Sequence, residues 1–301
     1  MRLRILAFIL AAILLSMSGC APKDSSGAFV DALGREITVS SPQRVGIASG
    51  SLAECWLLAG GSVCAVTQDA RERNLELPAD VIDLGGLKNP SLEVILSSDL
   101  DFLILMPSLQ NHLAMAETLD MAGINYAYFD VENFDDYLEL MRLFTGITGR
   151  SDLYEANAEA LELRIAAALE RARMEEPKKV LILRTSSGKI KALDSSTMVG
   201  QMLKDFGCVN IADSGSGLLT DLSLEAIVRE DPDYIFISCM GDVEEGVAML
   251  ESTLAANPVW DTLQAVKNGR CHYLEKELFH YKPNARWGES YEKLAELLLQ
   301  D

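Results

Sequence analysis

Residues 91–104 read SLEVILSSDLDFLI, and residues 223–236 read SLEAIVREDPDYIF, which is the same pattern 132 positions later. In each copy a serine suited to capping a helix is followed two residues on by a glutamate, Glu93 or Glu225. This places a carboxylate in the first helical turn, where the helix dipole favours it. An Asp-x-Asp turn then leads into an apolar strand. A helix-and-strand unit that occurs twice predicts two similar α/β lobes.

The rest of the chain alternates short apolar runs with helical periods. Strands are predicted at 45–48, 63–66, 102–106, 126–129, 180–184, 190–193, 234–238 and 271–274, and helices at 51–58, 111–121, 134–147, 198–206, 244–254 and 291–299. Between the two sets, residues 151–176 contain neither Gly nor Pro before Pro177. They predict one long helix that Pro177 ends. The fold class is therefore α/β, with two Rossmann-like α/β lobes joined by a single long backbone helix and a ligand cleft between the lobes.

The N-terminus has the features of an export signal, because Arg2 and Arg4 precede the uncharged apolar run 5–15. Small residues then lead into Cys20, which predicts a lipoprotein signal cut before a lipidated cysteine; an ordinary signal with an incidental cysteine is the alternative. We expect an extracytoplasmic protein anchored to the cell membrane only through this lipid. The predicted divisions are a signal peptide at 1–19, lipidated Cys and tether at 20–28, an N-terminal lobe at 29–149, a bridging helix at 150–176 and a C-terminal lobe at 177–301.

The composition is strongly acidic. Without residues 1–19 the chain has 24 basic and 45 acidic residues, a formal charge of −21, which excludes nonspecific binding to nucleic acid. The five remaining cysteines form no C-x-x-C pair and mostly lie in apolar runs. An odd number argues against a paired scaffold, so we expect buried free thiols, with a single Cys55–Cys64 bridge as the alternative.

Several segments together resemble a known family. They are residues 29–39, which read FVDALGREITV and predict two short strands turning near Gly34, both Ser-Leu-Glu segments, the helix from Ser151, and residues 257–260, which read NPVW. The chain resembles the periplasmic binding proteins for ferric siderophores, haem and cobalamin, whose two lobes are bridged by one helix. The resemblance implies an ABC permease dimer with its ATPase as the partner. It also implies that Glu93 and Glu225 pair with permease arginines, and we expect a monomer.

The ligand is expected at the carboxyl ends of the strands, facing the cleft. Loops there carry basic and aromatic side chains that suit an anionic chelate, namely Arg71, Arg73, Arg184, His280, Tyr281, Lys282, Arg286 and Trp287. A ferric siderophore is our first choice of ligand, and haem or cobalamin is the alternative. Met106, His280 and Tyr281 are the residues suited to bind haem iron. Against these roles, Arg73 suits a solvated loop, Arg184 a pair with a nearby acid, and Trp287 a core anchor of the last helix.

Two other functions fit less well. A bare Zn²⁺ or Mn²⁺ importer subunit needs several histidine and carboxylate ligands in the cleft, but the chain has only His112, His272 and His280. A two-lobed enzyme with a cysteine-bound metal cluster fits five scattered cysteines poorly, and no Gly-x-Ser-x-Gly elbow or phosphate loop is present. We therefore predict no enzymatic activity, no intrinsic cofactor and no metal site.

Overall fold

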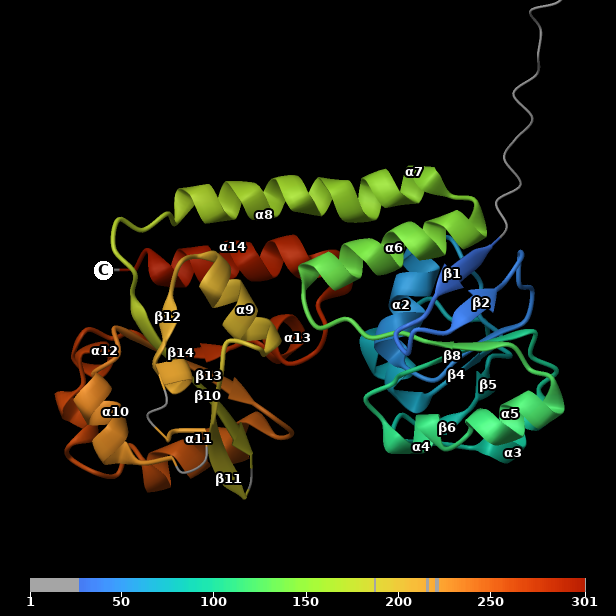
Figure 1. Cartoon of the computed structure of the whole chain (residues 1–301). Coiled ribbons are helices and arrows are strands. Elements are labelled where there is room, and N and C mark those ends of the chain that lie inside the picture. The colour runs from blue at the N-terminus through green and yellow to red at the C-terminus, as the bar shows by residue number, and fades with distance from the viewer. Residues whose placement is uncertain (1–26, 187, 215–216, 220–221, 301) are drawn as a thin grey trace, which may run out of the picture.

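The computed structural model describes residues 27–186, 188–214, 217–219 and 222–300. The predicted signal peptide and Cys20 lie outside these residues. Figure 1 shows two lobes side by side beneath one long helix. The predicted α/β architecture of two lobes with a bridging helix is therefore confirmed. None of the described helices is long and apolar enough to span a bilayer.

The N-terminal lobe is built on a five-stranded sheet in the order β5-β4-β3-β8-β9, in which every pairing is parallel. The strands are β3 (Val45–Ile47), β4 (Ala65–Val66), β5 (Ile82–Asp83), β8 (Phe102–Leu105) and β9 (Tyr126–Tyr128). β3, β8 and β9 are buried at every residue, because helices cover both faces of the sheet. A small hairpin of β6 (Gly85–Gly86) and β7 (Asn89–Pro90) adjoins it.

The two faces of this sheet pack into different cores. Phe102 and Ile104 of β8 join the core beneath α2 (Gly50–Leu58) and α6 (Phe134–Thr148), while Leu103 and Leu105 face the other way. That second face is covered by α3 (Leu92–Ser97), α4 (Gln110–Leu113) and α5 (Ala116–Ala122). The alternation of side chains along a strand accounts for this division.

The C-terminal lobe has a sheet in the order β11-β10-β13-β14, with β12 (Val209–Asn210) also paired to β10. Its strands are β10 (Lys179–Ser186), β11 (Lys189–Leu193), β13 (Tyr234–Cys239) and β14 (Cys271–Leu274). β11 runs antiparallel to β10, because so short a connection cannot make the crossover that a parallel strand needs. Its main helices are α9 (Met198–Asp205), α10 (Leu224–Glu230), α11 (Val243–Thr253), α12 (Gln264–Lys267), α13 (Lys276–Phe279) and α14 (Trp287–Leu298).

The bridge consists of α7 (Ser151–Tyr154), a π-helical turn at Glu155–Glu159 and α8 (Ala160–Arg171). It ends at Arg171, so the prediction that it reaches residue 176 is wrong at its C-terminal end. Pro177 excludes helix from the residues just before it, because its ring collides with a carbonyl one turn back. α14 lies alongside α8, and Arg164 and Glu292 join the two helices at 2.7 Å.

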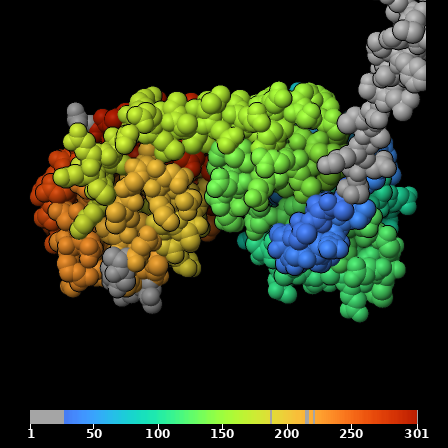
Figure 2. Space-filling model, turned by 45° about the horizontal axis from the view of Figure 1, so that its top comes forward, coloured from blue at the N-terminus to red at the C-terminus, as the bar shows by residue number. Residues whose placement is uncertain are grey.

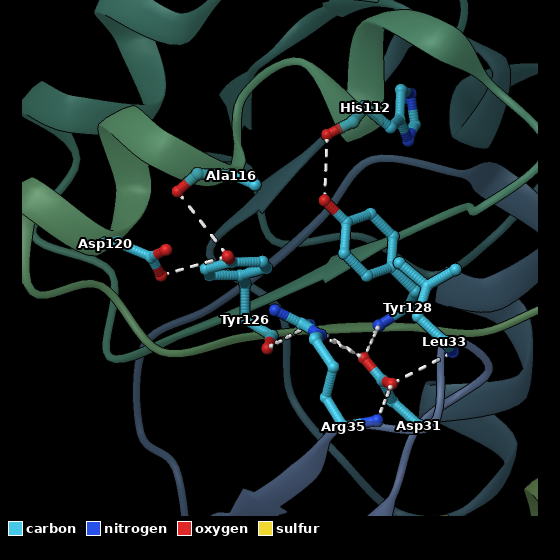
Figure 3. A network of polar contacts seen from close by, with 8 residues as sticks. All are labelled: Asp31, Leu33, Arg35, His112, Ala116, Asp120, Tyr126 and Tyr128. Atoms are coloured by element: carbon cyan, nitrogen blue, oxygen red, sulfur yellow. Dashed lines mark hydrogen bonds and ion pairs between the residues drawn. The ribbon is translucent and has the colours of Figure 1, made fainter.

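The hairpin of β1 (Ala28–Val30) and β2 (Glu36–Thr38) is held against β9 by a polar network (Figure 3). The Asp31 carboxylate accepts the Tyr128 N–H at 3.2 Å and the Arg35 guanidinium at 2.7 Å. Arg35 also lies over the rings of Tyr126 and Tyr128, 4.3 and 4.8 Å from their centres. Burial opposes ionisation of Asp31, yet Arg35 and the backbone donors hold its pKa below the ordinary value.

Candidate functional site between the lobes

A cavity of about 200 Å³ lies between the lobes. Glu132, which follows β9, lines it from the N-terminal lobe, and the rest of its lining comes from the C-terminal lobe: Arg184, Leu193, Thr197, Met198, Val199, Ser238, Phe279, His280 and Lys282. Arg184 and Ser238 are register partners near the carboxyl ends of β10 and β13. The cavity therefore occupies the predicted edge of the C-terminal sheet. Figure 2 shows the lobes meeting under the bridging helix, with a notch between them.

Arg184 is a cation of the cavity lining. It is partly buried, and no Asp or Glu among the described residues lies within ion-pair distance of it. Its Nε is buried without a hydrogen-bond partner in the described part of the chain. Burial lowers the pKa of Arg184, although an arginine stays charged at neutral pH. A partly buried cation without an acidic partner costs free energy, so this site favours the binding of an anion.

His280 lies beside it, with an Nδ1 that is buried and has no hydrogen-bond partner among the described residues. Burial lowers the pKa of His280, and the positive charges of Arg184 and Lys276 lower it further. The imidazole is therefore neutral at neutral pH and offers one nitrogen to a ligand as donor or acceptor.

Lys282 completes the basic group. Its Nζ lies 3.3 Å from the carboxylate of Glu132, so this ion pair crosses from one lobe to the other. The Lys282 side chain is 23% exposed and that of Glu132 is 59% exposed. Such a solvated pair is weak and is easily exchanged for another anion.

Three predicted ligand residues are used elsewhere. Arg73 forms an internal ion pair with Glu54 at 2.6 Å and does not line the cavity. Trp287 is fully buried and packs against Phe134, which makes it the core anchor of α14 instead of a ligand contact. Arg286 pairs with Glu289 at 2.7 Å, one helical turn away, and lies outside the cavity.

The other three do not line the cavity either. Arg71 is exposed near the end of a 3₁₀ helix at Gln68–Arg73, and Met106 is half-buried just after β8. The Tyr281 ring lies near two cations, 5.0 Å from Lys276 Nζ and 6.0 Å from the Arg73 guanidinium. The cavity lining thus includes Arg184, His280 and Lys282 but not Arg71, Met106 or Tyr281. The Tyr281 ring nevertheless lies 5.5 Å from the His280 ring.

Sequence reasoning missed Ser238, Thr197 and Glu132 as lining residues. Ser238 could have been found, because it ends the predicted strand 234–238, and a position at a strand end was the criterion for choosing Arg184. Glu132 lies in the loop after the predicted strand 126–129. It was not selected, because the candidates were basic and aromatic residues suited to an anionic ligand and Glu132 is acidic. The Thr197 side chain caps α9. A threonine before a helix is explained by capping alone, so nothing in the sequence indicated that Thr197 also lines the cavity.

The three histidines lie in different surroundings. His112 is fully buried, its Nδ1 accepts the Met106 N–H at 3.0 Å, and its Nε2 donates to the Leu87 carbonyl at 2.7 Å. His272 lies in β14 with its ring against Phe236. Only His280 faces the cavity, so the three do not converge as a zinc site requires.

Glu93 and Glu225 occupy equivalent places in the two lobes. Each is exposed in the first turn of its helix, behind a serine whose hydroxyl accepts a backbone N–H at 3.3 Å in α3 and 3.4 Å in α10. Figure 1 places both helices on the side of the molecule away from the bridging helix. Both carboxylates therefore lie on helices of one common face.

Comparisons with known proteins agree with this architecture. The model of the family described as periplasmic binding protein matches residues 53–278. The Fe(3+)-citrate-binding protein YfmC of Bacillus subtilis (strain 168) is 22% identical over 270 residues, which is 86% of this chain and 82% of that protein.

Two solved structures share the fold. The siderophore-binding protein BauB, bound to two molecules of acinetobactin and ferric iron, superposes with a TM-score of 0.70 at 18% identity, covering 91% of this chain and 99% of that one. IsdE of S. aureus in complex with heme gives 0.68 at 17% identity, covering 86% and 99%. With the family model matching most of its length, the chain belongs to the periplasmic binding proteins, the substrate-binding components that work with an ABC permease and its ATPase.

Proposed function

We propose that this protein captures an anionic iron chelate, such as a ferric siderophore, and delivers it to an ABC importer. The observation that carries the proposal is the partly buried Arg184, which has no acidic partner among the described residues and lines the cavity with His280 and Lys282. In a chain of formal charge −19, a partly buried arginine without an acidic partner needs a functional reason. A chelate with carboxylate or catecholate oxygens supplies the missing acceptors.

The similar proteins support the same class of ligand. YfmC is named for Fe(3+)-citrate, and BauB was solved with a ferric chelate. A cavity of about 200 Å³ is below the usual 300–1,000 Å³ of ligand pockets, so a small chelate such as ferric citrate suits it best.

Haem is the second candidate, because neutral His280 presents an unpartnered Nδ1 to the cavity and IsdE was solved with heme. The two other residues suited to haem iron, Met106 and Tyr281, lie outside the cavity lining, which favours the chelate. No observation on the described residues favours cobalamin.

The remaining parts of the proposal concern delivery. Glu93 and Glu225 dock the two lobes onto the two halves of a permease dimer, since opposite charges set registry between such partners. The protein acts as a monomer and is held at the outer side of the cell membrane by lipid on Cys20. The apolar run followed by small residues and Cys20 supports this anchor.

The test is a fluorescence titration of the purified protein with ferric citrate, iron-free citrate, haem and cobalamin. Arg184→Ala should weaken ferric citrate binding about tenfold to a hundredfold, the worth of a hydrogen bond to a charged group. Arg286→Ala is the matched control, because that arginine is already paired with Glu289 and should leave affinity unchanged. Tight binding of cobalamin alone, indifferent to Arg184→Ala, contradicts the proposal.

A further inference from the structure

The loop at residues 280–286, called here the crossover loop, leaves the C-terminal lobe and contacts the N-terminal lobe. Its contact residue is Asn284, whose Nδ2 donates to the Glu54 carboxylate at 2.8 Å and to the Ser51 carbonyl at 3.0 Å. Glu54 also holds Arg73 at 2.6 Å. We call Ser51, Glu54, Arg73 and Asn284 the Asn284 clamp.

The clamp is largely removed from solvent. Asn284 is fully buried and has a φ of 49°, a left-handed conformation that asparagine tolerates better than most residues. On the other side, Gly50 begins α2 where a Cβ would lie 2.6 Å from the Ala70 backbone, so α2 and the 3₁₀ helix that carries Arg73 are in close contact. The side chains of Arg73 and Glu54 are 15% and 20% exposed.

The clamp is joined directly to the cavity. Arg73 Nη2 donates to the Lys282 carbonyl at 2.5 Å, and the crossover loop carries both His280 and Lys282 into the cavity lining. Apart from the clamp, the polar contact of Lys282 with the N-terminal lobe among the described residues is the half-solvated pair with Glu132 at 3.3 Å. Loss of the clamp would therefore leave His280 and Lys282, the two cavity residues of this loop, on a less ordered segment.

We propose that Asn284 is a positioning residue for ligand capture: it fixes the crossover loop so that His280 and Lys282 are already in place when the ligand arrives. The proposal rests on the function proposed above. A group that is ordered before binding costs less entropy on binding, so affinity depends on the clamp even though Asn284 does not line the cavity.

The experiment compares Asn284→Gly with Asn74→Gly. Glycine accepts a left-handed backbone, so Asn284→Gly removes the side-chain contacts without adding strain. Asn74 is a matched control because it is exposed and has a similar φ of 54°. In Asn284→Gly, hydrogen exchange across residues 279–286 should accelerate in the unliganded protein, and ferric citrate should bind about five- to tenfold more weakly. Asn74→Gly should change neither.

A double-mutant cycle separates positioning from a general loss of stability. If Asn284 acts through Lys282, then Lys282→Ala costs less affinity in the Asn284→Gly background than in the wild type. Additive losses, unchanged exchange at 279–286, or wild-type affinity in Asn284→Gly each overturn the inference. A wild type that does not bind ferric citrate contradicts the proposed function instead, and the ligand-free exchange measurement still decides whether Asn284 holds the loop.

Discussion

At the scale of single residues, Glu132 is the one acidic side chain in the cavity lining, and it pairs with Lys282. The Glu132 carboxylate opposes the binding of an anionic ligand in two ways. It repels the negative charge of the ligand, and its ion pair with Lys282 keeps the Lys282 ammonium from the ligand. Glu132→Gln should therefore bind ferric citrate about two- to fivefold more tightly, the range expected for a solvated ion pair. The affinity of the variant for a neutral ferric hydroxamate should equal that of the wild type. Isothermal titration at low and high salt measures the difference, and Glu139→Gln on α6 is the control. Equal gains for charged and neutral chelates contradict the prediction.

The sequence located the site better than it assigned the individual residues. Arg184 lies near the carboxyl end of β10, and His280 and Lys282 follow α13, the helix after β14; these positions place them at the cavity. Arg73 and Trp287 satisfied the same criterion but do not line the cavity, because they contact Glu54 and Phe134, which are distant in sequence. Whether a strand-end cation is free or paired depends on tertiary packing, as in the contact of α2 with the 3₁₀ helix that carries Arg73.

At the scale of elements, the β1–β2 hairpin depends on Asp31. Asp31→Asn should lower the free energy of unfolding by about 2 kcal/mol at pH 7, because a buried charge-assisted pair loses one partner. The folded-state pKa of Asp31 lies below its ordinary 3.8, so its stabilisation is present above that value and is lost as the pH falls through the folded pKa. Urea unfolding should show the wild type and the variant converging below about pH 4.

Asp152→Asn is the control for this measurement. Asp152 also pairs with an arginine at 2.7 Å, but its side chain is 64% exposed, so stability should barely change. A difference between Asp31→Asn and the wild type that persists undiminished in strong acid would show that the hairpin is held by packing alone.

Most elements were predictable because buried parallel strands are apolar runs and covering helices are periodic. The structure differs from the predicted helices at positions where the local residue pattern does not indicate a break or a change of helix type. The helix expected at 111–121 is two, α4 and α5, and the bridge contains a π-helical turn at 155–159. The antiparallel direction of β11 follows from a short connection, which was visible in the sequence.

At the scale of the whole molecule, Glu93 and Glu225 are exposed on helices of one face. Glu93→Lys or Glu225→Lys should leave the ferric citrate dissociation constant within about twofold of wild type and should abolish most uptake of labelled ferric citrate, because rim charges govern docking. Glu117→Lys, another exposed first-turn glutamate, is the control. Loss of chelate binding in either docking variant, with the fold intact, contradicts the docking role.

The crossover loop also has a consequence for the order in which the chain folds. Trp287 fills the N-terminal lobe beside Phe134, and Asn284 closes against α2, so the first lobe is completed by residues near the end of the chain. One continuous core includes residues of both lobes as well as α8 and α14. A chain that is made N-terminus first therefore cannot complete the contacts of its first lobe until residues 284–287 have been added.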